Sequence, residues 1–266
     1  MNSASRLVIL FATLGWYGAA AESRPEAQRA FKKYAASVEA RIERDRFTPN
    51  FLRVASDPAT RARLRAGEIP AKSAKSLGIE PSVAIPSGLV EHWVSAAFLP
   101  HATIAAAMPQ LQDYANRKRF MWPEIIDSRT LSRQGNDFEV YLRVSEKSII
   151  SGVLDMNLQI TYRMHNHDLA IDSRSEKIVE VAGADAPVGS SSRDRGLLWA
   201  LNHYWRMAEA DGGVYLECEA LTLSRRPPAM ARWIADPLIA QAARKTVINT
   251  VRATMRIMAS PENQAE

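Results

Sequence analysis

The sequence predicts an α+β protein in which a series of antiparallel strands faces a long C-terminal helix. Three observations carry this prediction. Apolar and polar residues alternate over residues 138–144 and 154–162, which is typical of strands with one solvated face. After residue 228, apolar residues instead recur at three- and four-residue spacing as far as residue 258, which indicates a helix. The same helical spacing appears near the N-terminus, over residues 25–46.

Size and composition suit one globular domain with an extension. The chain has 266 residues, of which 47% are apolar and 24% are charged. Its formal net charge of +5 comes from basic residues scattered among acidic ones, which is compatible with contact to an anionic membrane surface. No basic stripe is present, so we expect no nucleic acid as a partner. Cys218 is the single cysteine and cannot form an internal disulfide, so packing has to supply the stability.

Residues 1–21 have the pattern of a signal peptide. Arg6 supplies a positive charge, an apolar run follows at residues 7–17, and three alanines at residues 19–21 form a small-residue cleavage site. An uncleaved membrane anchor is the alternative, but the apolar run is shorter than the roughly 20 residues that a membrane-spanning helix needs. We therefore expect cleavage after Ala21 and an exported protein, either periplasmic or secreted.

Residues 22–88 are predicted to form a helical and irregular extension. The helix over residues 25–46 is followed by a short helical stretch at residues 57–66 that begins with Asp-Pro. Prolines and glycines then follow at close spacing up to Gly88, which is typical of irregular chain.

The main domain is predicted to span residues 89–258. It opens with a strand at residues 89–99, followed by a helix with Thr103 as its N-cap, and then by the antiparallel strands, which continue over residues 169–181, 196–208 and 214–223. The long helix begins after the two prolines at residues 227–228. Residues 259–266 are expected to form a disordered tail.

One turn sets the register of the last two strands. Asp211-Gly212 suits a two-residue type I′ turn, and such a turn fixes which residues pair across the hairpin. Arg206 then faces Glu217 on the outer side, where we expect an exposed ion pair. The inward-facing pairs are Trp205 with Cys218, Met207 with Leu216 and His203 with Ala220.

Several segments resemble those of a known superfamily. GLLWALNHYWR at residues 196–206, GVYLECEAL at residues 213–221 and Ser-Arg at residues 224–225 look like the last two strands of exported bacterial START-like proteins. Glu-His-Trp at residues 91–93 and Gln-Asp-Tyr at residues 112–114 are similar to segments of the same proteins. The order of strand, helix, antiparallel strands and long helix also resembles this START-like (SRPBCC, helix-grip) superfamily.

The resemblance implies a fold and a kind of ligand. A helix-grip fold is a curved antiparallel sheet wrapped around the long C-terminal helix. Members of the superfamily commonly hold lipids, sterols, polyketides or other apolar molecules in the cavity between sheet and helix. The expected function is therefore binding or carriage of a hydrophobic or amphiphilic small molecule outside the cytoplasm. Two alternatives stay open: a cyclase- or hydrolase-type enzyme using the same cavity, and a cell-envelope interaction module whose cavity is filled by its own side chains.

The candidate ligand-binding residues lie on the predicted inner surfaces. His203 stands out because an imidazole on an interior face needs a hydrogen-bond partner, from the protein or from a ligand. Valine and methionine offer adaptable apolar contacts on the helix, and threonine can bond a polar head group. The full predicted set is His92, Trp93, Leu201, His203, Trp205, Leu216, Cys218, Val247, Thr250, Val251, Thr254 and Met255.

The sequence contains no complete motif for catalysis, metal binding or a cofactor. Cys218 is predicted to be buried mid-strand, where its thiol pKa would be raised and its reactivity low. His165 and His167 are possible metal donors in an expected turn, but no further ligands complete a site. The chain has no phosphate-binding glycine motif and no dinucleotide fingerprint. We therefore expect no catalytic residue, no metal and no cofactor.

Overall fold

The computed structural model describes residues 17–80, 83–121, 123–146, 152–190 and 198–260. Two predicted segments lie largely outside these ranges: residues 1–16 of the signal peptide and residues 261–266 of the tail. Cleavage after Ala21 and export therefore stay predictions. Within the described ranges, no helix is both long enough and apolar enough to cross a bilayer.

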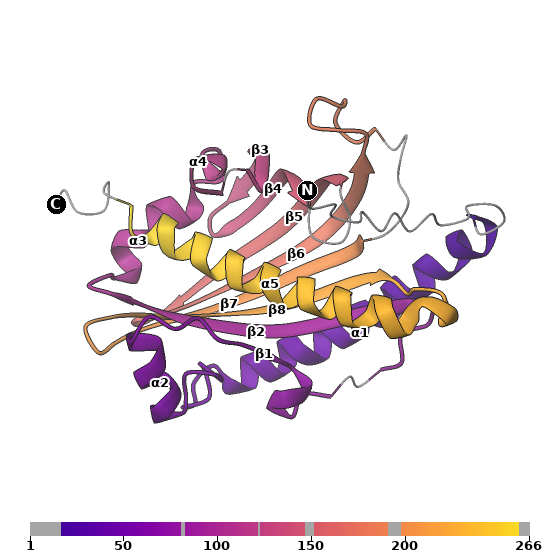
Figure 1. Cartoon of the computed structure of the whole chain (residues 1–266). Helices are drawn as coiled ribbons and strands as arrows, with labels where there is room; N and C mark the ends of the chain where they lie inside the picture. The colour runs from indigo at the N-terminus through magenta and orange to yellow at the C-terminus, as the bar shows by residue number, and fades with distance from the viewer. Residues whose placement is uncertain (1–16, 81–82, 122, 147–151, 191–197, 261–266) are drawn as a thin grey trace, which may run out of the picture.

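The core of the structure is one antiparallel sheet with the strand order β1-β2-β8-β7-β6-β5-β4-β3 (Figure 1). Strand β1 pairs with β2, and each of β3 to β7 pairs with the next strand along the chain, whereas β2 also pairs with the last strand, β8. The strands are β1 (Ala71–Ser73), β2 (Gly88–Pro100), β3 (Ile125–Gln134), β4 (Asp137–Glu146), β5 (Gly152–His165), β6 (Asp168–Val181), β7 (Leu198–Ala210) and β8 (Gly213–Arg225).

Helices cover both faces of this curved sheet. The long helix α5 crosses one face, and α1 lies against the other (Figure 1). Pro237 does not interrupt α5, which ends at Met258 as predicted. The helix-grip arrangement predicted from the sequence is thereby confirmed. The helices are α1 (Tyr17–Asp45), α2 (Pro58–Arg65), α3 (Ile104–Gln112), α4 (Arg117–Met121) and α5 (Arg232–Met258), with short 3₁₀ turns η1 (Lys75–Leu77) and η2 (Ala229–Ala231).

The β7–β8 hairpin has the predicted register. Asp211 and Gly212 have φ angles of 54° and 75°, the left-handed backbone that a type I′ turn requires at both central positions. Trp205 pairs with Cys218, and Arg206 pairs with Glu217. The predicted inner side is also confirmed, because Trp205, Met207, Leu216 and Cys218 all belong to the core that α5 covers.

The outer face of this hairpin is buried, and the prediction of an exposed Arg206–Glu217 pair is wrong. Both residues have an exposed fraction of 0%. Helix α1 covers this face with Phe31, Tyr34 and other apolar side chains, which pack against β7 and β8. Alternation along a strand shows which residues share a face, but not whether another segment covers that face. The apolar stripe of α1 is buried against this face of the sheet.

The extension is packed onto the sheet along its length. Its strand β1 pairs with β2, with Ala71 opposite Ser95. Residues 51–55 and Leu64 form a further apolar cluster with the outer faces of β2 and β8. The sheet strand β2 begins at Gly88, one residue before the predicted start of the main domain. The division into 22–88 and 89–258 stays a prediction, although the first part supplies a strand and a cover for the second.

Candidate functional site

A cavity of about 520 Å³ lies between the inner face of the sheet and the C-terminal half of α5. Strands β4 to β7 form its wall on one side, and residues 245–256 of α5 lie on the other. Apolar side chains dominate the sheet wall. They are Leu142, Val144, Leu154, Met156, Leu158, Ile160, Ile171, Leu198, Leu201, Trp205 and Met207.

Strand alternation places these side chains in the wall. In β5 every second residue from Leu154 to Tyr162 is buried in the inner core. The paired strand β4 contributes Leu142 opposite Met156 and Val144 opposite Leu154. The period-two pattern of the sequence therefore builds the apolar wall directly, and the sheet supports it as a rigid surface.

The border of the cavity carries an excess of positive charge. Lys245, Arg252 and Arg256 of α5 are exposed there, and Arg117 of α4 adds a fourth cation. Glu124 is the single acidic side chain among the described residues that line the cavity. An apolar interior with a cationic border suits a molecule that has an apolar body and a polar or anionic end.

Near α3, the polar groups of the cavity wall have partners within the protein. The Tyr114 and Tyr162 hydroxyl oxygens are 2.5 Å apart, and the Tyr162 hydroxyl also donates to the Leu111 carbonyl at 2.6 Å. The guanidinium of Arg117 donates to the same carbonyl at 2.6 Å and lies over the Tyr114 ring, 4.7 Å from its centroid. Because these groups satisfy one another, they need no ligand.

His203 differs from those groups. It lies on the inner face of β7, directly opposite Ser173 of β6, and both residues line the cavity. The Nε2 atom of His203 is buried and has no hydrogen-bond partner among the described residues. Burial lowers the pKa of His203 to about 4, so the imidazole is neutral at pH 7.

Five of the twelve predicted ligand-binding residues line the cavity. These are Leu201, His203, Trp205, Thr250 and Thr254. The predicted set contains no residue of β4 or β5, although the inward-facing leucines, isoleucine and methionine of these strands form much of the wall. Their signal was present in the alternation of residues 138–144 and 154–162. It identified a buried face without showing where the helix stops covering it.

The other seven residues lie elsewhere. Helix α5 packs directly on β2 and β8, so the cavity opens only further along the sheet, over β4 to β7. His92 lies on the opposite, outer face of the sheet, under α1. Leu216, Cys218, Val247 and Val251 are fully packed in the inner core, and Trp93 and Met255 contact that core from partly buried positions.

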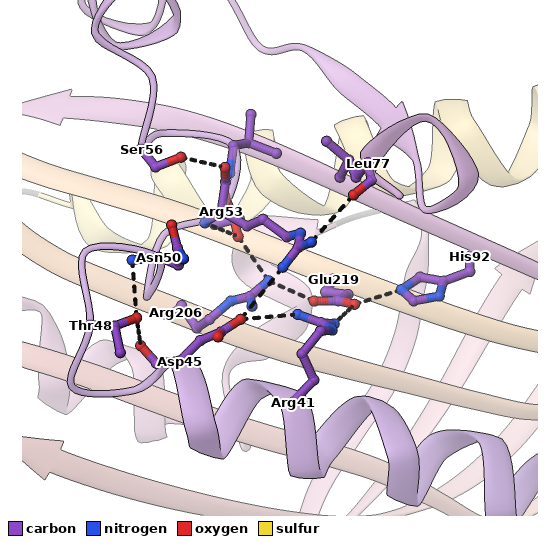
Figure 2. A network of polar contacts seen from close by, with 12 residues as sticks. Arg41, Asp45, Thr48, Asn50, Arg53, Ser56, Leu77, His92, Arg206 and Glu219 are labelled. Atoms are coloured by element: carbon purple, nitrogen blue, oxygen red, sulfur yellow. Dashed lines mark hydrogen bonds and ion pairs between the residues drawn. The ribbon is translucent and has the colours of Figure 1, made fainter. Parts of the chain in front are cut away.

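His92 belongs to a buried polar network on the outer face (Figure 2). Its Nε2 atom lies 2.6 Å from Glu219 Oε1, and its Nδ1 atom lies 2.6 Å from the hydroxyl of Tyr34 on α1. Arg206 binds both neighbouring carboxylates, Glu219 at 2.7 Å and Glu217 at 2.8 Å. This network fastens α1 to the sheet, on the face away from the cavity.

The pKa values of the two carboxylates in the network are shifted in opposite directions. Burial raises the pKa of Glu219, but Arg206, His92 and Arg41 together outweigh burial and lower this pKa to about 2. Burial raises the pKa of Glu217, and here Arg206 does not compensate fully. Glu217 also accepts hydrogen bonds from the backbone N–H groups of Arg53 and Val54, at 3.0 and 2.5 Å. The chain after α1 is therefore also tied to β8.

Metal binding and thiol chemistry find no support in the described ranges. No group of three or more His, Cys, Asp or Glu side chains there could hold a metal ion. Cys218 is fully buried, and burial raises the pKa of its thiol well above the usual value. A protonated, enclosed thiol is not a nucleophile.

Known proteins were compared with the chain by sequence and by structure. No family model and no curated protein sequence matches. The ZhuI aromatase/cyclase from Streptomyces sp. R1128 is 12% identical with a TM-score of 0.46, over 64% of this chain and 98% of that one. Human STARD10 is 11% identical with a TM-score of 0.43, over 75% of this chain and 80% of that one. A STAR-related lipid transfer protein from Xanthomonas axonopodis is 11% identical with a TM-score of 0.42, over 64% and 97%.

Similarities at this level of identity concern the fold alone. The order and pairing of the elements are those of a helix-grip fold: an antiparallel sheet of eight described strands with a long C-terminal helix across its inner face. The fold implied by the sequence resemblance is thus confirmed.

Proposed function

We propose that this protein binds or carries a hydrophobic or amphiphilic small molecule in the cavity between the sheet and α5. The observation that carries the proposal is the apolar cavity of about 520 Å³. Ligand pockets in proteins usually measure about 300–1,000 Å³ and have mainly apolar walls. An interaction module with a filled core would leave no such space, so this alternative loses its support. The predicted signal peptide would place the binding outside the cytoplasm.

The charged border supports an amphiphilic ligand with an anionic end. Three exposed cations of α5, Lys245, Arg252 and Arg256, lie beside the cavity. The apolar body of a fatty-acid-like molecule would occupy the sheet wall, and its head group would remain near these side chains. Such an arrangement leaves the charged group hydrated, which avoids the large cost of burying an ion.

The enzymatic alternative has weaker support. A cyclase or hydrolase needs an acid–base pair that faces the substrate within hydrogen-bond reach. His203 is the titratable imidazole of the described wall, and burial alone accounts for its lowered pKa, with no contribution from a neighbouring carboxylate. A neutral imidazole without an orienting partner is better suited to contacting a ligand than to transferring its proton.

The binding proposal can be tested with pyrene, an apolar fluorescent probe. We expect saturable uptake of one pyrene per chain, with the emission spectrum of an apolar environment. Ala253→Phe should abolish it, because Ala253 lines the cavity and the added ring would occupy the space. Ala259→Phe, at an exposed position just after α5, is the matched control and should bind pyrene like the wild type. Absence of saturable binding to the wild type would refute the proposal.

Contact with an anionic membrane is proposed for the start of α5. Apolar side chains of η2 and of the first turns of α5 are exposed there. Those of α5 recur at a helical spacing that brings them to one side, and tryptophan is favoured at membrane interfaces. Arg225, Arg226 and Arg232 are close to them in the sequence and complement anionic lipid. The exposed fractions are 91% for Met230, 77% for Trp233, 43% for Ile234 and 53% for Leu238.

Vesicle co-sedimentation tests this contact. Vesicles of phosphatidylglycerol should retain the protein, and vesicles of phosphatidylcholine should retain less of it. Trp233→Ser should weaken retention severalfold, whereas Phe47→Ser, which removes a 67% exposed aromatic ring from a different region, should leave it unchanged. Equal retention of both variants would show that the start of α5 is not the contact surface.

A further inference from the structure

Two polar side chains interrupt the apolar wall at one place. Ser173 and His203 are paired residues on β6 and β7, which puts their Cβ atoms about 4.5–5.5 Å apart on the cavity face. The next inward pair along the same two strands is Ile171 with Trp205, both apolar. The polar pair is therefore a local feature within an apolar surface.

The protein leaves one atom of this pair without a partner. Nε2 of His203 is buried, and among the described residues none is within hydrogen-bonding reach of it. A buried polar atom without a hydrogen bond destabilises the fold, and native proteins rarely retain one without a reason. Leucine or phenylalanine would line an apolar cavity at this position without that cost. Nε2 itself has almost no accessible surface, but the His203 side chain as a whole is only partly buried and lines the cavity. The exposed part of the imidazole can therefore meet a polar group of the ligand.

We propose that the ligand carries a hydroxyl or carbonyl oxygen that meets His203 and Ser173, so that the cavity selects oxygenated apolar molecules over plain hydrocarbons of the same shape. This inference rests on the proposed function and deepens it. A neutral imidazole accepts a hydrogen bond from a hydroxyl or donates one to a carbonyl, according to its tautomer, and the serine hydroxyl can do either. The cations of the cavity border lie on α4 and α5 rather than on β6 or β7. An ionised head group would therefore contact the border, and a neutral oxygen would contact His203 and Ser173.

Pyrene and 1-hydroxypyrene test the inference because they differ by one hydroxyl. The wild type should bind 1-hydroxypyrene about twofold to tenfold more tightly than pyrene, the range that one hydrogen bond gives. His203→Leu should remove this preference while leaving the affinity for pyrene within about twofold. His203→Gln, which keeps a hydrogen-bonding side chain, should retain part of the preference, and Ser173→Ala should reduce it.

Thermal unfolding of the ligand-free protein supplies a second readout. His203→Leu should raise the Tm, because it removes a buried atom that has no partner. A histidine whose role is purely structural would give a lower Tm on the same substitution. His167→Leu, whose side chain is 80% exposed in the β5–β6 turn, is the matched control and should change neither the Tm nor the preference between the probes.

The outcomes separate this inference from the function on which it rests. If the wild type binds neither probe, the proposed function fails, and this inference fails with it. If it binds both probes equally and His203→Leu changes nothing, the carrier function stands and the proposed recognition of an oxygen is overturned. A lower Tm of His203→Leu with an unchanged preference also overturns it, because His203 would then be a structural residue.

Discussion

Residues two positions apart on α5 have different environments. Val251 has an exposed fraction of 0% and is packed in the inner core, whereas Ala253, although its exposed fraction is only 4%, borders the cavity. The sequence placed Val251 on the cavity because it shares the apolar stripe with Thr250 and Thr254, which do line it. A stripe shows which side of a helix is buried, but it does not show where the opposing surface stays in contact and where it curves away.

Substitution at the two positions should therefore have different effects. Val251→Trp should overpack the core and reduce the free energy of unfolding by about 1–3 kcal/mol. Ala253→Phe should cost less, because its ring enters existing space, and it should block pyrene. Urea unfolding of both variants measures the difference. A Val251→Trp protein as stable as the wild type would mean that the cavity extends further toward β2 and β8 than described.

At the scale of elements, the attachment of α1 depends on buried charge. Glu219 of β8 contacts Arg206 of β7, His92 of β2 and Arg41 of α1 (Figure 2). Removing one partner of a buried charge network costs about 3–5 kcal/mol, since the remaining charges lose their compensation. We expect Glu219→Gln to destabilise the protein by about this amount at pH 7. Glu68→Gln, which disrupts an exposed pair with Arg63, is the control and should have little effect.

The same network determines how the free energy of unfolding should change with pH. The pKa of Glu219 is lowered from 4.5 to about 2 in the folded protein. Its contribution to stability is therefore fully present above about pH 4.5 and is lost as the pH falls toward 2. The difference in unfolding free energy between the wild type and Glu219→Gln should shrink over this interval. A difference that stays constant from pH 5 to pH 2.5 would contradict the ionised state of Glu219.

Much of the secondary structure could be predicted from local patterns. The helices α1, α2, α3 and α5, six of the strands and the β7–β8 register were predicted because periodicity and turn residues are local signals. Strand β3 was missed, since residues 125–134 are largely polar and exposed along the edge of the sheet. The three-residue strand β1 is too short to show a period.

The burial of the outer face could not be predicted from the sequence, and the reason is physical. Arg206, Glu217 and Glu219 are charged, and charged residues are usually exposed. Here they compensate one another beneath α1, which no pattern within one strand reveals. Burial of this kind depends on pairs of side chains from different elements, so it becomes visible only when the fold is known.

At the scale of the whole molecule, residues 17–88 and the sheet share three contacts of different kinds. They share β1 in the sheet, apolar clusters under α1 and residues 51–55, and the charge network around Glu219. We expect a chain trimmed at residue 85 to unfold at a lower Tm and with lower cooperativity, because the outer face would lose its cover. Calorimetry of the trimmed and full chains checks this. A trimmed chain with the native Tm would establish residue 89 as the start of an independent domain.

The candidate site was predicted only in part, because a cavity forms where two facing surfaces do not touch, and sequence patterns do not show where this happens. His203 and Trp205 were found because strand register places them inward. The cavity itself depends on the angle at which α5 leaves the sheet, and thus on packing over many residues. Sequence patterns identify the surfaces that face each other, but they do not give the distance between those surfaces.

Native mass spectrometry can show whether this cavity holds an apolar small molecule. The wild type, Ala253→Phe and Ala259→Phe would each be incubated with a total lipid extract, purified without detergent and weighed intact, and the bound material would be extracted into organic solvent. We expect one added small molecule per chain in the wild type and in Ala259→Phe, and none in Ala253→Phe. Three bare chains, with nothing in the organic extracts, would contradict this expectation.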